Sequence, residues 1–260
     1  ANKYSKINNL FIYKNLNLTI APLYILENKI VLKEIIDGKI SIELENDLNE
    51  LIKNPLMIRM DINTCKQEKQ LLPREEFRDI STVKKWLIEK ANIFKDKILD
   101  EKIDIGFLFH NFIPASSSAF AYANPNSRKV LIEALWGLPE GLYYNSHDKY
   151  VIDTKAIHEN KDLDNYTIES KKSYKKYFVR SNEDGVWNTE ELKAPFDWKL
   201  TIPENSKWLK EIALFSKMIA LKVNKPLSIM WFIDVPKEIS PNQILLDMLY
   251  VKKLFQIFQI

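Results

Sequence analysis

Apolar and polar residues alternate along several short stretches of this chain, a pattern typical of β-strands with one buried face. The alternation, together with short apolar runs, predicts strands over residues 55–62, 103–112, 117–124, 129–136, 150–154 and 227–234. In the first of these strands, Arg59 and Asp61 are expected on one face and Met60 on the other, because side chains alternate along a strand.

Turn residues predict hairpins in two parts of the chain. Residues 22–44 are apolar and rich in β-formers, with a turn at 27–29 and a second turn at Asp37-Gly38, a strong hairpin signal. A further hairpin is predicted over 174–190, with its turn at Asp184-Gly185.

Helical spacing of apolar residues predicts four helices, over residues 46–53, 81–97 and 207–223 and in a last segment that Pro241 opens. Ser81 is the predicted N-cap of the second helix, and Asn205 or Ser206 that of the third. Strands and helices follow one another without regular β-α-β alternation. This order predicts an α+β fold of mostly antiparallel sheets with packed helices.

The composition is that of an ordinary globular protein, with 46% hydrophobic and 28% charged residues and a net charge of +3. Basic residues are scattered, so we expect neither nucleic acid nor a membrane surface as a partner. The single cysteine, Cys65, cannot form an internal disulfide, and no apolar run approaches the roughly 20 residues of a membrane-spanning helix. We therefore expect a cytoplasmic protein.

Glycine is scarce, with five residues in 260, well below the usual share of about 7%. The chain has no G-x-G-x-x-G and no G-x-x-x-x-G-K-[ST] motif, which excludes a Rossmann fingerprint and a P-loop. Any nucleotide would have to be held by side chains and by strand backbone.

The segment from residue 110 to 154 carries the most specific pattern: three short apolar strands surround a turn, with Glu133 on the last of them and Glu140 in the W-G-L-P-E that follows. It resembles the ATP-grasp nucleotide domain of the pyruvate phosphate dikinase and phosphoenolpyruvate synthase family. The resemblance implies an ATP-grasp-like fold that binds ATP and Mg²⁺. It also implies two parts, a partial phosphate-contacting α+β subdomain at 1–100 and an ATP-grasp-like subdomain at 101–260.

Within this resemblance, Glu133 and Glu140 are the candidate metal ligands, because magnesium is commonly held by one or two carboxylates together with phosphates and water. The alternative is that Glu133 lies on the surface of an edge strand and Glu140 caps the turn after Pro139. The sequence alone favours that alternative, since charged residues are mostly exposed.

The resemblance also implies contacts to the nucleotide. Arg59, in a strand similar to the family's "vaVRSSa", would reach the phosphates and act in catalysis, although Asp61 is an alternative partner for it. Arg74 would make a second phosphate contact. His110 stands where the family has a glutamine and would bond adenine or ribose; otherwise it points to water. Met230 replaces a glutamate of the family.

Three functions remain open. The first is an ATP-binding phosphotransferase domain whose phosphate acceptor lies outside this chain, on a phosphohistidine-type domain or in a larger polypeptide. The second is a catalytically degenerate nucleotide sensor or protein-interaction domain, because the family's phosphate-binding lysine segment has no visible counterpart here. The third is an unrelated α+β enzyme such as an ATP-dependent carboxylate ligase.

Overall fold

The computed structural model describes residues 12–13, 15–18, 20, 23–63, 74–99, 104–159 and 167–246. The chain forms two compact units, each described here by itself. The first consists mainly of Ala21–Phe112, and the second mainly of Ile113–Asn182 and Trp187–Ile260. The first unit extends past the predicted subdomain boundary at residue 100, because the strand that follows this boundary pairs in its sheet.

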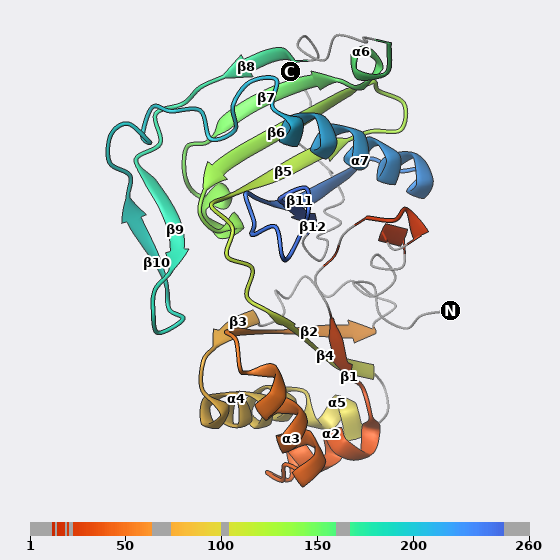
Figure 1. The fold of residues 1–260 in the computed structure, drawn as a ribbon. Helices are drawn as coiled ribbons and strands as arrows, with labels where there is room; N and C mark the ends of the chain where they lie inside the picture. Colours follow the sequence, from red (N-terminus) through yellow and green to blue (C-terminus); the bar gives the residue numbers. More distant parts are fainter. Residues whose placement is uncertain are drawn as a thin grey trace. The chain divides into compact units, whose positions relative to one another are not determined.

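The first unit is an antiparallel sheet of four strands in the order β1-β4-β2-β3, with helices packed on one face (Figure 1). Its strands are β1 (Tyr24–Leu26), β2 (Leu56–Asn63), β3 (Arg74–Phe77) and β4 (Asp104–Asn111). Its helices are α2 (Lys29–Ile36), α3 (Ile42–Leu51), α4 (Ile80–Ile93) and α5 (Lys95–Leu99).

Strand β2 alternates as the sequence predicts. Ile58 and Met60 are fully buried in the core between the sheet and the helices, where they join Trp86 of α4. Arg59 and Asp61 belong to the opposite face of the strand and are also buried, each with 2% of its surface exposed. Polar side chains therefore lie within the protein on the face that carries no helices.

The hairpins predicted over residues 22–44 are wrong: only β1 is extended, and α2 and the start of α3 occupy the rest. The apolar residues follow helical spacing, since Leu32, Ile35 and Ile36 face the core together. Asp37-Gly38 ends a helix instead of turning a hairpin. Gly38 has a φ of +76°, and its N–H donates to the carbonyl of Ile35 while that of Lys39 donates to Glu34. These two bonds form a Schellman cap.

Two other helix boundaries differ from the prediction. Helix α3 begins earlier than residue 46, because the Ser41 side chain caps it by accepting from the N–H of Leu44 at 3.2 Å. Helix α4 is capped by Asp79, which accepts from the N–H of Thr82 at 2.8 Å, so Ser81 lies inside the first turn. Asp is as good an N-cap as Ser, and sequence spacing does not separate them.

The second unit contains an antiparallel sheet of six strands in the order β12-β11-β5-β6-β7-β8 (Figure 1). The strands are β5 (Ser117–Ala123), β6 (Lys129–Trp136), β7 (Asp148–Asp153), β8 (Thr167–Lys171), β11 (Leu227–Ile233) and β12 (Ile244–Leu246). The other elements are the 3₁₀ helix η1 (Pro139–Tyr143), α6 (Thr154–Glu159), α7 (Lys207–Val223) and a hairpin of β9 (Tyr177–Ser181) and β10 (Trp187–Glu191).

Helix α7 covers one face of this sheet. Ser206 is its N-cap, one of the two residues predicted for that role. The indole N–H of Trp231 on β11 donates to the Ser216 hydroxyl of α7 at 3.1 Å. Lys217 donates to three backbone carbonyls of the β5–β6 connection, those of Asn124, Pro125 and Ser127. The helix is therefore held by hydrogen bonds to β11 and to the connection between β5 and β6.

The predicted α+β class with mostly antiparallel sheets and packed helices is confirmed. The hairpin over 174–190 is confirmed as β9 and β10. The last helix is wrong in its described part, because Ile244–Leu246 pairs with β11 as a strand; the rest of that prediction lies outside the described residues. No helix within the described ranges is both long and apolar enough to cross a membrane.

Candidate functional site

A row of side chains crosses the six-stranded sheet on the face opposite α7. Strand register aligns Met230, Phe120, Glu133, Lys149 and Lys171, one from each of β11, β5, β6, β7 and β8. Side chains in register on neighbouring strands lie on the same face and interact with each other. The row is apolar at one end and cationic at the other, with a single carboxylate between.

Glu133 is the centre of this row. Its Oε1 lies 2.8 Å from Nζ of Lys149 and 3.3 Å from Nε2 of His147, the residue just before β7. Burial by itself raises the pKa of the Glu133 carboxyl, but His147 and Lys149 outweigh burial and lower that pKa to about 2. Glu133 is therefore a carboxylate at every physiological pH.

The surroundings of His147 favour its positively charged form. Its Nδ1 lies 2.9 Å from the carbonyl oxygen of Asn145, which can only accept, so this nitrogen is protonated. Its Nε2 faces the Glu133 carboxylate in an ion-pair contact rather than a well-aligned hydrogen bond. The Glu133 carboxylate raises the pKa of the imidazole above its usual range, although burial opposes this. Both ring nitrogens face acceptors, which favours the imidazolium.

Aromatic and apolar side chains surround Glu133. Phe120 packs with Leu135, Leu142 and Met230 in a buried cluster, and its ring centre lies 5.4 Å from that of Tyr143 on η1. Burial raises the pKa of Tyr122, and the nearby Glu133 carboxylate raises it further. The phenol therefore stays protonated and can donate to an anion.

Glu140 lies on η1, which follows β6 directly. Gly137 sets the direction of this turn with a φ of +72°. The hairpin docks against the turn, because the N–H of Leu138 donates to the carbonyl of Val179 at 2.7 Å. The structure thus keeps Glu133 and Glu140 in one unit, on adjacent elements. Their joint role as metal ligands stays a prediction.

The side chains of Asp148-Lys149-Tyr150 point to alternate faces of β7. Lys149 points to Glu133, whereas Asp148 and Tyr150 point to the side of α7. Tyr150 exchanges hydrogen bonds with the backbone N–H and C=O of Ile202 at 3.0 and 2.9 Å. Asp148 is fully buried and pairs with Lys175, which is fully buried as well, at 2.9 Å.

Asp148 also fixes the loop before α7. It accepts from the N–H of Ser173 at 2.9 Å, and from the N–H and hydroxyl of Thr201 at 2.7 and 2.8 Å. Four donors thus converge on the Asp148 carboxylate, which lies between His147 and Lys149 in the sequence. The buried network therefore fixes the start of β7, where His147 and Lys149 face Glu133.

The candidate nucleotide contacts Arg59, Arg74 and His110 all belong to the first unit. Register places Arg59 opposite Arg74 of β3, and His110 of β4 opposite Met57, two residues before Arg59. All three positions therefore share the helix-free face of that sheet. Arg59 and His110 are buried, and Nδ1 of His110 lies 2.8 Å from the carbonyl of Asn111. Their roles stay predictions.

Magnesium and ATP fit the row around Glu133 in part. No group of three or more His, Cys, Asp or Glu side chains that could hold a metal ion occurs in the described part of the chain. A Mg²⁺ site of one or two carboxylates is instead completed by phosphates and water. An ionised Glu133 with adjacent cations offers the ligand that Mg²⁺ needs and the charges that phosphate needs.

A scan against models of protein families finds no match to this chain, and a search of curated proteins finds none. Solved structures similar to it include D-alanyl-alanine synthetase A from Vibrio cholerae, at 12% identity over 96% of this chain and 56% of that one, with a TM-score of 0.42. An N5-carboxyaminoimidazole ribonucleotide synthetase in complex with ADP has 11% identity over 96% and 45%, with a TM-score of 0.48.

A third similar structure is an ATP-grasp ligase from Chryseobacterium gregarium, solved with ADP and a leader and core peptide. It shares 10% identity over 94% of this chain and 50% of that one, with a TM-score of 0.40. The chain spans about half the length of each of these structures. Because every TM-score is below 0.5, the functional argument rests on the residues of this chain.

The ion pair of His147 predicts a pH dependence. A histidine whose pKa is raised by folding stabilises the protein fully below its usual pKa of about 6.5, and the contribution is lost as pH rises through the raised value. Above about pH 6.5, the unfolding free energy should therefore fall more steeply in the parent protein than in His147→Gln. Urea unfolding of both proteins at pH 5.5, 7 and 8.5 measures this difference.

The titration of His147 provides an independent check. Imidazole NMR shifts should give a pKa above the usual histidine range in the parent protein and a lower one in Glu133→Gln. An unchanged His147 pKa in Glu133→Gln would contradict the role of the carboxylate.

Proposed function

We propose that this chain is an ATP-grasp-like domain that binds Mg-ATP for transfer of a phosphoryl group to an acceptor outside it. The observation that carries the proposal is the row on the sheet of the second unit. In that row the ionised Glu133 lies beside Lys149 and His147, next to the apolar Phe120 and Met230. A nucleotide has the same sequence of features, an apolar base followed by phosphates with their metal ion.

Each group in the row has a distinct task under this proposal. Glu133 binds Mg²⁺, together with Glu140 from η1. Lys149 and His147 then turn from Glu133 to phosphate oxygens, where their charge is most useful. Phosphoryl transfer needs little beyond positioning and charge neutralisation, so cations and Mg²⁺ supply most of the catalysis. Bound Mg²⁺ would neutralise the part of the phosphate charge that Lys149 and His147 do not neutralise.

Arg59, Arg74 and His110 belong to the first unit, and their roles at a nucleotide are proposed from the family resemblance. Arg59 contacts the phosphates and acts in catalysis, with Arg74 as a second phosphate contact and His110 as a partner of adenine or ribose. The shared sheet face of these three positions supports a common ligand. The resemblance to the phosphoenolpyruvate synthase family favours a phosphohistidine-type domain or a larger polypeptide as the acceptor.

A second candidate is a nucleotide sensor or protein-interaction domain that has lost catalysis. The observation that favours it is Met230, which is buried on β11 where the resembling family has a glutamate. A third is an ATP-dependent carboxylate ligase, which would use the same site and differ only in the acceptor.

Glu133→Gln separates metal binding from nucleotide binding. The substitution removes a ligand of Mg²⁺, so Mg-ATP should bind about tenfold more weakly or worse, the loss of a charge-assisted contact. ATP without magnesium should bind as tightly or more tightly, because the phosphates no longer face a carboxylate. Calorimetric titration of the purified protein with ATP, with and without magnesium, measures both affinities.

Glu190→Gln is the matched control. Glu190 also pairs with a cation, Arg180 at 3.2 Å, but lies on the exposed hairpin. Glu190→Gln should leave the affinities for Mg-ATP and for ATP without magnesium unchanged. Equal losses in Glu133→Gln with and without magnesium would remove Glu133 from the metal site, and no ATP binding by the folded parent protein would overturn the proposal.

A further inference from the structure

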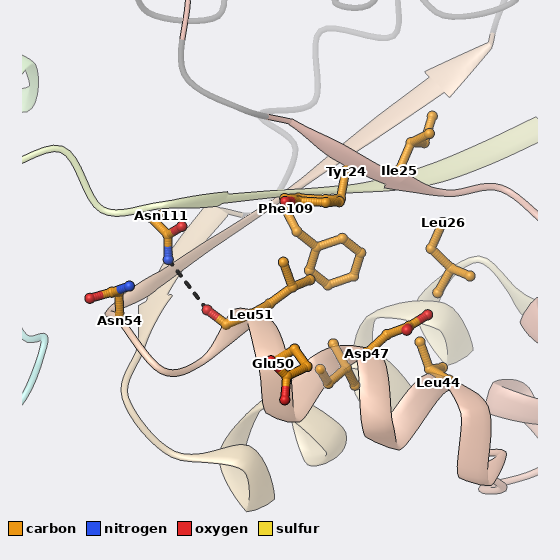
Figure 2. Close-up of a pocket in the computed structure, with 11 residues that line it drawn as sticks. Tyr24, Ile25, Leu26, Leu44, Asp47, Glu50, Leu51, Asn54, Phe109 and Asn111 are labelled. Atoms are coloured by element: carbon orange, nitrogen blue, oxygen red, sulfur yellow. Dashed lines mark hydrogen bonds between the residues drawn. The ribbon is translucent and has the colours of Figure 1, made fainter. Parts of the chain in front are cut away.

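The first unit contains a groove that the proposed function does not use. It lies between α3 and β1, the edge strand of the described sheet, and has a volume of about 510 Å³. This volume is in the range of about 300–1,000 Å³ that is usual for small-molecule sites. Figure 2 shows the Phe109 ring between the strand and the helix, with side chains of α3 along the opposite wall.

The floor of the groove is apolar. Leu48 of α3 and Phe109 of β4 are buried there, with 1% and 3% of their surfaces exposed. Tyr24 pairs with Phe109 across the strands, so both rings belong to the sheet side of the groove. Tyr24 is exposed at 52%, so its side chain offers an aromatic surface that remains open to a ligand.

The helix wall is negatively charged. Helix α3 carries four acidic residues and no basic one: Glu43, Glu45, Asp47 and Glu50. Glu45 pairs with Lys84 and Glu50 with Lys53. No described cation pairs with Asp47, which lines the groove. The C-terminal end of the helix adds partial negative charge to the same wall, and its last turn holds no basic side chain to offset it.

One end of the groove is closed. The side-chain amide of Asn111, at the end of β4, donates to the carbonyl of Leu51, at the end of α3, at 3.3 Å (Figure 2). An extended peptide could not run through the groove without breaking this bond, whereas a small molecule fits beside it.

We propose that this groove binds a small organic amine. The apolar body of the ligand lies on Phe109 and Tyr24, and its ammonium group lies against Asp47. Aromatic faces attract cations, and a carboxylate on the opposite wall gives the ammonium a charged hydrogen-bond partner. This site is independent of the proposed nucleotide site, so a test of one site does not decide the other.

The test uses three ligands of nearly the same shape, titrated into the full chain by calorimetry at low salt. Phenylethylammonium should bind, phenylethanol should bind about tenfold more weakly, and phenylacetate should show no binding. Equal affinities of the amine and the alcohol, or no binding of the amine, would overturn the proposal. If acetyl-phenylalanyl-lysine amide binds and phenylethylammonium does not, the groove is a peptide site and the small-molecule proposal is wrong.

Two matched variants test whether Asp47 provides the negative charge that binds the ammonium group. Asp47→Asn keeps the shape of an exposed side chain and should weaken phenylethylammonium about tenfold, to the level of the alcohol, while leaving the alcohol unaffected. Glu43→Gln removes one charge from the same helix outside the groove and should change neither affinity. Equal losses in the two variants would show a general effect of helix charge and would overturn the assignment to Asp47.

Discussion

Lys175→Met is expected to destabilise the protein by about 3–5 kcal/mol, the usual result of removing one partner of a buried ion pair. Lys175 and Asp148 are both fully buried, and their atoms lie 2.9 Å apart. Without the lysine, the Asp148 carboxylate keeps the donors of Ser173 and Thr201 but loses its only described counter-charge. Urea unfolding followed by tryptophan fluorescence measures the change in unfolding free energy.

The neighbouring lysine provides the control. Lys176 is exposed, so Lys176→Met should stay within about 0.5 kcal/mol of the parent protein. The double variant Asp148→Asn with Lys175→Met should recover part of the loss, because it leaves no unpaired charge. A cost of Lys175→Met no larger than that of Lys176→Met would show that the ion pair contributes nothing to stability.

Gly137→Ala should cost about 2–5 kcal/mol, the sum of backbone strain and overpacking. Gly137 has a φ of +72°, and an added Cβ would lie 2.2 Å from the carbonyl oxygen of Val179 and 2.8 Å from the Phe178 ring. Since this carbonyl accepts the N–H of Leu138, the hairpin would have to move away from η1. Unfolding in urea and proteolysis within β9–β10 should both detect the loosened contact.

Gly38→Ala separates the two contributions. Gly38 has nearly the same φ, +76°, but an added Cβ would meet no atom within 4 Å. Its cost should therefore be that of the left-handed backbone alone, about 1 kcal/mol. If the two alanine variants lose equal stability, the approach of Val179 to Gly137 plays no part.

Four strands of the six-stranded sheet, β5, β6, β7 and β11, could be predicted from their short apolar runs. Strand β8 was not predicted, and β12 falls in a segment predicted as a helix. The N-terminal helices could not be found in the same way. Leu32, Ile35 and Ile36 fit helical spacing, but their β-branched neighbours and the Asp37-Gly38 pair indicated a hairpin. A glycine after a polar residue both turns hairpins and ends helices, and only the backbone hydrogen bonds distinguish these cases.

The site was partly accessible from the sequence. Glu133 was a candidate from the family resemblance, and its pairing with Lys149 follows once β6 and β7 are set in register. His147 could not be assigned to Glu133, because the turn before β7 has no regular period. The partnership of Asp148 with Lys175 joins residues that no local pattern connects, so it required the structure.

Because the side chains on the two faces of β7 have different roles, the sequence changes that this strand can accept in evolution are limited. Each position can accept substitutions suited to its own side of the sheet. A single inserted or deleted residue would instead turn every later side chain to the other side. Lys149 would exchange surroundings with Asp148 and Tyr150, and the charged cluster and the buried anchor would be lost in one step. Length variation in this region should therefore be confined to the connections on either side of the strand.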